Sequence, residues 1–270
     1  MMWSRSELKS QAKTVLQGRY WTAFLVCLFV GGIGSAGATL TSFIPFAPLA
    51  VSLFITPPLI VGQSRWFSRG REAAAVPAFD QVFSLFRGGS WGPTVGAMLW
   101  MYLFLFLWSL LAVFPLAVFV PLLVAARVFR RPLDHPWPES LAGDHVGAAL
   151  ILVVVFLALL LAIPAFVKMY SYRMVPWILA DNPRIGYDRA LKLSMALTQG
   201  QRWNIFVLDL SFLGWFILGL LACGIGTLFV MPYYWAVYAE LYARLRHSGV
   251  ERALCTMEEL GFIPANHYLG

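Results

Sequence analysis

Charged side chains are scarce in this sequence. Only 12% of its 270 residues are Asp, Glu, Lys or Arg, whereas 60% are hydrophobic. A soluble domain is about one-quarter charged and about one-half apolar. The mean hydropathy of +0.72 deviates in the same direction. So little polar side chain cannot cover a water-soluble globule, which excludes a soluble enzyme and a disordered chain. We therefore expect lipid to surround most of the protein.

Cysteine is also rare, and its three positions exclude a scaffold held together by disulfides. Cys27 and Cys223 fall in apolar runs at opposite expected depths, and Cys255 falls near the C-terminus, so no pair is placed to form a disulfide. The sequence also lacks a Ser/His/Asp or Cys/His arrangement, a pair of catalytic carboxylates and a phosphate-binding loop. We therefore expect no enzyme activity, no metal and no cofactor.

Long apolar runs are the main feature that is present. Four of them suit a membrane span, which needs about 20 helical residues. A fifth, over residues 205–243, would make a helix about 58 Å long, roughly twice the hydrocarbon thickness. It must therefore turn back, and Gly224 and Gly226 supply the turn. The sequence thus predicts an all-α integral membrane protein with six transmembrane helices, at about 21–41, 43–62, 94–120, 146–167, 205–222 and 227–242.

The basic residues lie between these runs and predict the orientation. Of the 20 Lys and Arg residues, 17 fall on one side of the expected membrane and only three, in the loop near residues 127–131, on the other. Because positive charge collects on the cytoplasmic side, both termini are expected there. Topology and anionic inner-leaflet headgroups explain the net charge of +7 without a nucleic-acid partner. A cleavable signal peptide ending near residues 36–38 is the alternative at the N-terminus, but the apolar run continues past that point.

Three segments between the spans are predicted to be amphipathic helices on the inner membrane surface. In residues 4–17, Leu8, Ala12 and Leu16 share one face, while basic residues at spacings of four share another. Residues 77–87 are rich in Phe. Residues 184–199 follow an expected cap at Asp181-Asn182-Pro183 and stop at Gly200. Residues 1–246 are thus expected to form one transmembrane domain, and residues 247–270 a cytoplasmic tail.

This third helix also carries a resemblance to a known family. The chain resembles the bacterial membrane proteins grouped as domain of unknown function 975, over nearly its whole length to about Arg246. The resemblance implies a multi-pass protein of the bacterial cytoplasmic membrane with no assigned biochemistry. It is most specific from residue 161 onward, in the motifs Ile163-Pro164, Asp181-Asn182-Pro183, Ser194, Gly200, Gly214-Trp215, Gly224-Ile225-Gly226 and Pro232-Tyr233.

The chain departs from the family pattern in the middle and at the end. In the family, a Trp-Ser-Leu-Leu run leads almost directly into Ile-Pro, but here about fifty residues separate Trp108 from Ile163. The segment after residue 247 also lies outside the match. The shared residues are mostly Gly, Pro, Trp and Tyr, which serve packing and interfacial anchoring. The resemblance therefore implies a location and not an activity.

Two acidic residues are expected inside the membrane. Asp209 and Glu240 should lie at similar depth near the cytoplasmic side, with Lys168 as their expected partner. A carboxylate at mid-membrane costs about 2.5 to 3.5 kcal/mol on insertion scales, so each should have a partner or a hydrated cavity. The group is therefore either a structural ion pair, which we favour, or a polar site for a cation, a proton or an amine.

Two further features have weaker functional interpretations. The outer loop repeats an Asp-His pair at residues 134–135 and 144–145, with Glu139 between them, but the spacing matches no metal signature. Prolines occur in several spans, at residues 57, 58, 115, 121, 164 and 232. Such prolines can break helices at transport sites, and they are also common in ordinary membrane helices.

Two functions follow as hypotheses. The first is a non-enzymatic protein that acts through contacts with the bilayer, with another membrane protein or with a second copy of itself, in a regulatory, assembly or protective role. The second is a small-molecule or ion transporter with Asp209, Glu240 and Lys168 in its path. Sparse intramembrane charge and the lack of an inverted repeat favour the first.

Overall fold

The computed structural model describes residues 3–73, 75–128, 144–222 and 224–262, and these residues form helices and connecting turns without a strand. The chain divides into two compact units. Unit 1 comprises Met1–Met101 and Tyr170–Gly270, and unit 2 comprises Tyr102–Met169. The predicted all-helical class is confirmed. The predicted boundary at residue 246 does not mark the end of a structural element, since α11 continues to Glu251.

Five helical segments are long and apolar enough to cross a membrane. They are Tyr20–Gly37, Ala47–Glu72, Trp91–Leu122, Ala149–Asp181 and Arg202–Leu221. These correspond to the first five predicted spans. The sixth prediction, at 227–242, falls in helix α11 (Ile225–Glu251), which is not among the five. Its C-terminal half contains Glu240, Arg244 and Arg246, which lower its hydropathy.

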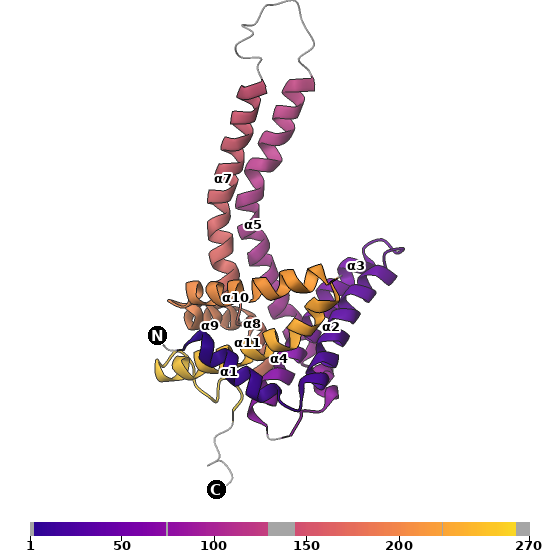
Figure 1. Cartoon of the computed structure of the whole chain (residues 1–270), viewed down its shortest axis with the longest axis vertical. Helices are drawn as coiled ribbons and strands as arrows, with labels where there is room; N and C mark the ends of the chain where they lie inside the picture. Colours follow the sequence, from indigo (N-terminus) through magenta and orange to yellow (C-terminus); the bar gives the residue numbers. More distant parts are fainter. Residues whose placement is uncertain (1–2, 74, 129–143, 223, 263–270) are drawn as a thin grey trace, which may run out of the picture. The chain divides into compact units, whose positions relative to one another are not determined.

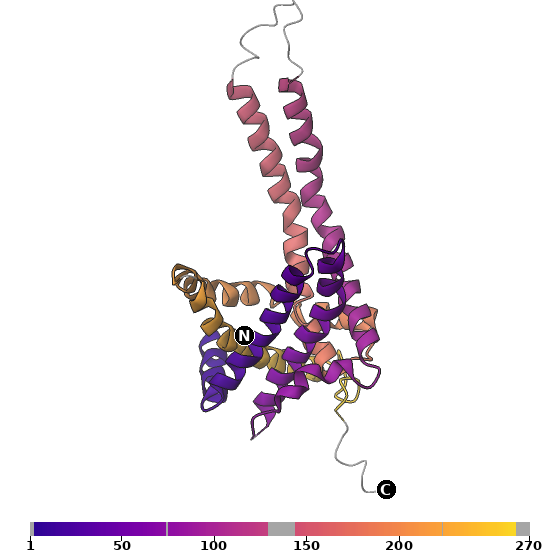
Figure 2. The same ribbon diagram turned by 90° about the vertical axis from the view of Figure 1, so that its right-hand side faces the viewer.

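The N-terminal part of unit 1 is a helical hairpin preceded by a shorter helix (Figures 1 and 2). Helix α1 (Arg5–Leu16) buries Leu8, Ala12 and Leu16 and packs along α11. Helix α2 (Tyr20–Leu40) is followed by α3 (Ala47–Ala50), the π-helical turn η1 (Val51–Ile55) and α4 (Thr56–Glu72). The π turn lies just before Pro57-Pro58, where the proline ring disturbs the regular hydrogen bonds.

The segment that follows helix α4 packs very closely against it. The 3-10 helix η2 (Phe79–Phe86) packs on it, and a Cβ atom on Gly62 would lie 1.9 Å from the carbonyl oxygen of Val82. Only glycine allows this approach. At the end of α4, Arg19 donates to the carbonyls of Gly70 and Ala73 at 2.7 and 3.0 Å, which satisfies groups that the helix leaves unpaired.

Two short and two long helices complete unit 1. They are α8 (Val175–Asp181), α9 (Tyr187–Thr198), α10 (Arg202–Leu221) and α11. Helices α10 and α11 form a hairpin whose turn contains Gly224 in a left-handed conformation, as predicted. The two backbones approach so closely at Gly219 and Gly226 that a Cβ on Gly219 would lie 2.6 Å from the Thr227 nitrogen.

Unit 2 consists of parts of α5 (Trp91–Val128) and α7 (Asp144–Ser171), which run side by side in both views (Figures 1 and 2). Large apolar side chains on both helices point outward, including Phe114 (67% exposed) and Leu152 (69% exposed). Pro115, Pro121 and Pro164 lie inside continuous helices, and so does Pro232 in α11. The helices therefore continue through these prolines, as ordinary membrane helices with proline do.

Candidate functional site

Asp209 is surrounded by hydroxyl donors and one arginine in unit 1. Its carboxylate accepts hydrogen bonds from Tyr170 (3.1 Å), Tyr234 (3.1 Å) and Tyr238 (2.5 Å), and Arg173 lies 3.5 Å away. The Arg173 guanidinium also donates to Tyr234 and lies over the ring of Tyr238 at 5.0 Å. The Asp209 side chain is only 21% exposed. Its charge is therefore compensated within the helices α7, α10 and α11 and the turn after α7.

Glu240 has a different partner on a different face of α11. Its side chain is 4% exposed, and its carboxylate accepts from Arg71 Nε of α4 at 2.8 Å. Tyr238, which binds Asp209, is two residues away and so about 200° around the helix. The two acids thus form separate ion pairs instead of the single group that was expected. Lys168 belongs to unit 2, where its Nζ lies 5.3 Å from the centre of the Trp108 ring.

The Asp181-Asn182-Pro183 motif joins two short helices, but it does not cap the second one. Asn182 accepts from the backbone N–H of Arg184 at 2.9 Å, forming a local turn. Gly186 then takes a φ of +90°, and α9 begins at Tyr187 instead of residue 184. The predicted position of this helix start is therefore wrong, because the turn uses the Asn side chain before the helix begins.

Ser194 and Gly200 have clear structural roles in α9 and after it. Ser194 is fully buried, donates to the carbonyl of Ser171 at 2.7 Å and accepts from the N–H of Met174 at 3.2 Å. It therefore fixes α9 against the turn between α7 and α8. Gly200 has a φ of +76° and follows the end of α9, as expected of a helix stop.

Asp181 is part of a larger set of charges that the sequence did not reveal. Its side chain is 8% exposed, and it accepts from Tyr242 at 2.7 Å and from Arg246 at 3.0 Å. Arg246 also binds Glu72 of α4 at 2.6 Å. The guanidinium of Arg246 lies over the rings of Tyr242 and Phe262, at 5.7 and 4.4 Å. We call Arg71, Glu72, Asp181, Glu240 and Arg246 the arginine network.

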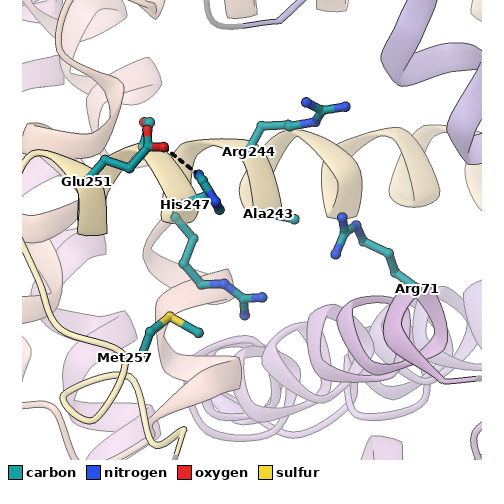
Figure 3. A pocket seen from close by; sticks show the side chains of 8 residues that line it. Arg71, Ala243, Arg244, His247, Glu251 and Met257 are labelled. Carbon is teal, nitrogen blue, oxygen red and sulfur yellow. Dashed lines mark ion pairs between the residues drawn. The ribbon is translucent and has the colours of Figure 1, made fainter.

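A cavity of about 500 Å³ lies beside this network (Figure 3). Its cationic residues all have carboxylate partners: Arg244 binds Glu7, and His247 lies 3.3 Å from Glu251. The cavity therefore offers little uncompensated charge to an anion. It is lined by Arg71, Ala243, Arg244, Arg246, His247, Ser248, Glu251 and Met257.

The segment after α11 packs onto the Asn182 turn. Asn182 donates to the carbonyl of Glu259 at 2.8 Å, and the Glu259 carboxylate binds Arg189 of α9 at 2.5 Å. The hydrogen bonds from Arg189 lower the pKa of Glu259. Burial lowers the pKa of Arg246, but Asp181 and Glu72 outweigh it and the net shift is upward. Both effects show that these charges stabilise one another.

Metal binding finds no support in the part of the chain that the structure describes, where no group of three His, Cys, Asp or Glu residues is placed to hold an ion. The Asp-His pair at residues 134–135 and Glu139 lie outside the described residues. The side chains of residues 144 and 145 also lie outside that description.

The helices and the compensated charges define a helical protein with five segments able to cross a membrane. The chain belongs to the family described as protein of unknown function DUF975, whose model matches residues 1–248. This match confirms the family resemblance, and the segment after α11 lies outside it. No curated protein and no solved structure matches the chain.

Proposed function

We propose that this chain is a multi-pass protein of a bacterial cytoplasmic membrane that acts through contacts with lipid and with membrane proteins, and not through catalysis. The observation that carries the proposal is the compensation of its intramembrane acids. Asp209 has three hydroxyl donors and Arg173, and Glu240 has Arg71. Separating such a buried pair would leave an uncompensated charge, which is costly. The pairs therefore favour a fixed structure over a transport path whose acids must exchange partners.

The apolar surface of unit 2 supports the same proposal. Two candidate spans, Trp91–Leu122 and Ala149–Asp181, contribute to this surface. In their most apolar stretches only 6% and 11% of the residues are buried within the protein. These side chains need lipid tails or another membrane helix as their surroundings. A second membrane protein or a second copy of the chain is the kind of partner that such a surface fits.

The proposal includes six spans with both termini in the cytoplasm. The distribution of Lys and Arg supports this orientation. The apolar first half of α11 returns from the Gly224 turn, and its charged second half would then lie at the cytoplasmic surface. Helices α1, η2 and α9 would lie on that surface as interfacial elements.

Reconstituted liposomes test the proposal against transport. We expect the wild-type protein to dissipate an imposed proton or potassium gradient no faster than protein-free liposomes. The Asp209→Asn and Glu240→Gln variants should lose thermal stability without changing that rate. Asp80→Asn is the control, since Asp80 is 62% exposed and lies 3.8 Å from Arg87. A leak that requires wild-type protein and disappears in both variants would support the transporter instead.

Photo-cross-linking in intact membranes tests the contact role directly. A photoreactive residue at Leu152 or Phe156, both more than 60% exposed on α7, should give adducts of defined protein mass. The same residue at Ala158, which is 6% exposed, is the buried control. Adducts with lipid alone at both exposed positions would contradict a protein partner at this surface.

A further inference from the structure

The residues after α11 form a compact turn with hydrogen bonds of its own. We call residues 254–262 the tail segment. The Thr256 hydroxyl accepts from the N–H of Glu259 at 3.1 Å. The N–H of Phe262 donates to the carbonyl of Met257 at 2.9 Å. Part of the shape of the tail segment therefore comes from bonds within the segment itself.

Two polar side chains from earlier in the chain bind the tail segment. Asn182, in the turn before α9, donates to the Glu259 carbonyl at 2.8 Å. Arg189 of α9 donates to the Leu254 carbonyl at 2.8 Å and to the two carboxylate oxygens of Glu259 at 2.5 and 2.9 Å. Any peptide has backbone carbonyls, so the carboxylate is the polar contact that can select among sequences.

Apolar side chains of the tail segment complete the contact. Leu260 is 1% exposed and Cys255 is 4% exposed. The guanidinium carbon of Arg246 lies 4.4 Å from the centre of the Phe262 ring. The tail segment thus presents an acid, a leucine next to it and an aromatic ring two residues further on. This order of side chains is the chemistry that the surface accepts.

The tail segment can leave this surface without leaving a buried charge unpaired. Arg246 would keep the two carboxylates of the arginine network that bind it. The side chains of the Arg189–Glu259 pair are 44% and 26% exposed, and ion pairs this accessible to water are weak. At the joint with α11, Ala253 has a φ of +54°, which is unfavourable for a residue with a Cβ atom. These are the properties of a segment that can detach.

We propose that the surface formed by Asn182, Arg189 and Arg246 is a docking site for an acidic segment of a partner protein, and that the tail segment is its displaceable internal occupant. The partner supplies a carboxylate to one arginine and an aromatic ring to the other, two groups that guanidinium binds well. The three surface residues lie within the family match, which ends at residue 248, whereas the tail segment lies beyond it. The inference rests on the proposed function, because it gives the contact role a second surface with a partner of defined chemistry.

A fluorescent peptide with the sequence of residues 253–262 and the change Cys255→Ser tests the site on the full chain in mild detergent. In the Glu259→Arg protein, repulsion from Arg189 should release the tail segment, so the peptide should bind. Wild-type protein should bind it about tenfold more weakly, because the tethered tail segment competes at a high effective concentration. Glu258→Arg, a change at the neighbouring exposed acid, is the matched control and should behave like wild type.

Exchanging the two charges tests the recognition itself. The Arg189→Glu protein should also release its tail segment, but it should not bind the original peptide. It should bind a peptide that carries Glu259→Arg, because the ion pair is then restored with its charges reversed. Equal binding of both peptides by both proteins would overturn the carboxylate as the selecting contact.

The reactivity of Cys255 in wild-type protein keeps the test decisive if these variants do not fold. Its buried thiol should react slowly with a maleimide, and peptide mapping measures this rate separately from the other cysteines. Excess unlabelled peptide should displace the tail segment and speed the reaction severalfold, whereas the peptide with Glu259→Arg should not. An unchanged rate, together with equal peptide binding by wild type and the Glu259→Arg protein, would overturn the docking site. Where the variants are unfolded, the unchanged rate alone would overturn it.

Native mass spectrometry separates a partner protein from a second copy of the chain. Wild-type dimers that Glu259→Arg abolishes would assign the surface to tail segments exchanged between copies and overturn the separate partner. None of these outcomes depends on the gradient assay or on cross-linking at unit 2, which test the proposed function separately.

Discussion

Arg246 connects more of unit 1 than any other side chain of the arginine network. Its guanidinium contacts Asp181 of α8 and Glu72 of α4 and lies between two aromatic rings, while its side chain is only 10% exposed. Arginine suits this place because its planar group can bind two carboxylates and stack on rings at once. A lysine could supply the charge but not this geometry.

Replacing Arg246 with alanine should therefore destabilise the protein strongly. The expected loss is about 3–5 kcal/mol, because Asp181 would remain buried without its cation. The matched control is Arg244→Ala, two residues earlier on the same helix, where both partners are more than one-third exposed. That pair should contribute roughly 0–1 kcal/mol. Thermal or denaturant unfolding in detergent measures both, and equal losses would contradict the bridging role of Arg246.

The Glu259–Arg189 pair should make stability depend on pH. The pKa of Glu259 is below its ordinary value of 4.5 in the folded protein. Its contribution is therefore present above pH 4.5 and is lost as the pH falls through the folded-state pKa. We expect the unfolding temperature of wild type to approach that of Glu259→Gln between pH 6 and pH 3.5. A difference between the two proteins that is constant over this range would rule out the linkage.

At the scale of elements, α4 determines where its neighbours lie. Its Gly62 admits the backbone of η2, and Arg65 of the same helix donates to the Ala180 carbonyl of α8 at 2.7 Å and to Ser84 at 3.1 Å. Trp66 Nε1 donates to the carbonyl of Pro77 at 3.0 Å. One helix therefore orients both the segment after it and the short helix that carries Asp181.

A methyl group at residue 62 should disturb this arrangement. Gly62→Ala places a Cβ against the Val82 backbone, which cannot rotate away, and overpacking of this kind costs about 1–3 kcal/mol. Gly96→Ala in α5 is the control, because nothing lies within 4 Å of its Cβ position and alanine favours a helix by up to about 1 kcal/mol. Equal unfolding temperatures for the two variants would show that η2 is not held against Gly62.

The sequence predicted the elements better than their ends and contacts. Apolar runs and the glycines at 200 and 224 predicted the helices and their stops, because burial in lipid and left-handed turns depend on local composition. The start of α9 was missed because the Asn182 side chain competes for a backbone N–H. The sequence left open whether the prolines break the helices, and the helices continue through them because a long helix tolerates the loss of one hydrogen bond.

At the scale of the whole molecule, the pairing of charges could not be predicted. Arg71 and Glu240 are 169 residues apart, and Arg246 and Glu72 are 174 apart. No local pattern identifies such partners, so Lys168 was expected to pair with the intramembrane acids because of its place at a helix end. The tyrosines at 170, 234 and 238 were a missed signal, since hydroxyl donors at a spacing of four on α11 predict an acceptor opposite them.

Cysteine labelling of intact cells can test the six-span topology. In a variant without the three native cysteines, Thr227→Cys and Ser140→Cys should react with a membrane-impermeant maleimide from outside. Ser10→Cys and His247→Cys should react only after the membrane is permeabilised. Thr227 is the decisive position, because it follows the turn between α10 and α11. Labelling of Thr227→Cys only after permeabilisation would show that α10 and α11 do not both cross.

The contacts of residues 254–262 also have a consequence for biogenesis. Leu254, Glu259 and Phe262 leave the ribosome after every predicted span, yet they bind Arg189 and cover Arg246. The Asn182 turn and the guanidinium of Arg246 therefore cannot form their last contacts until these residues have been synthesised. With the topology proposed above, membrane insertion and completion of this part of the fold would be separate events in time. A protease that acts on the cytoplasmic face would then meet an unfinished chain between them.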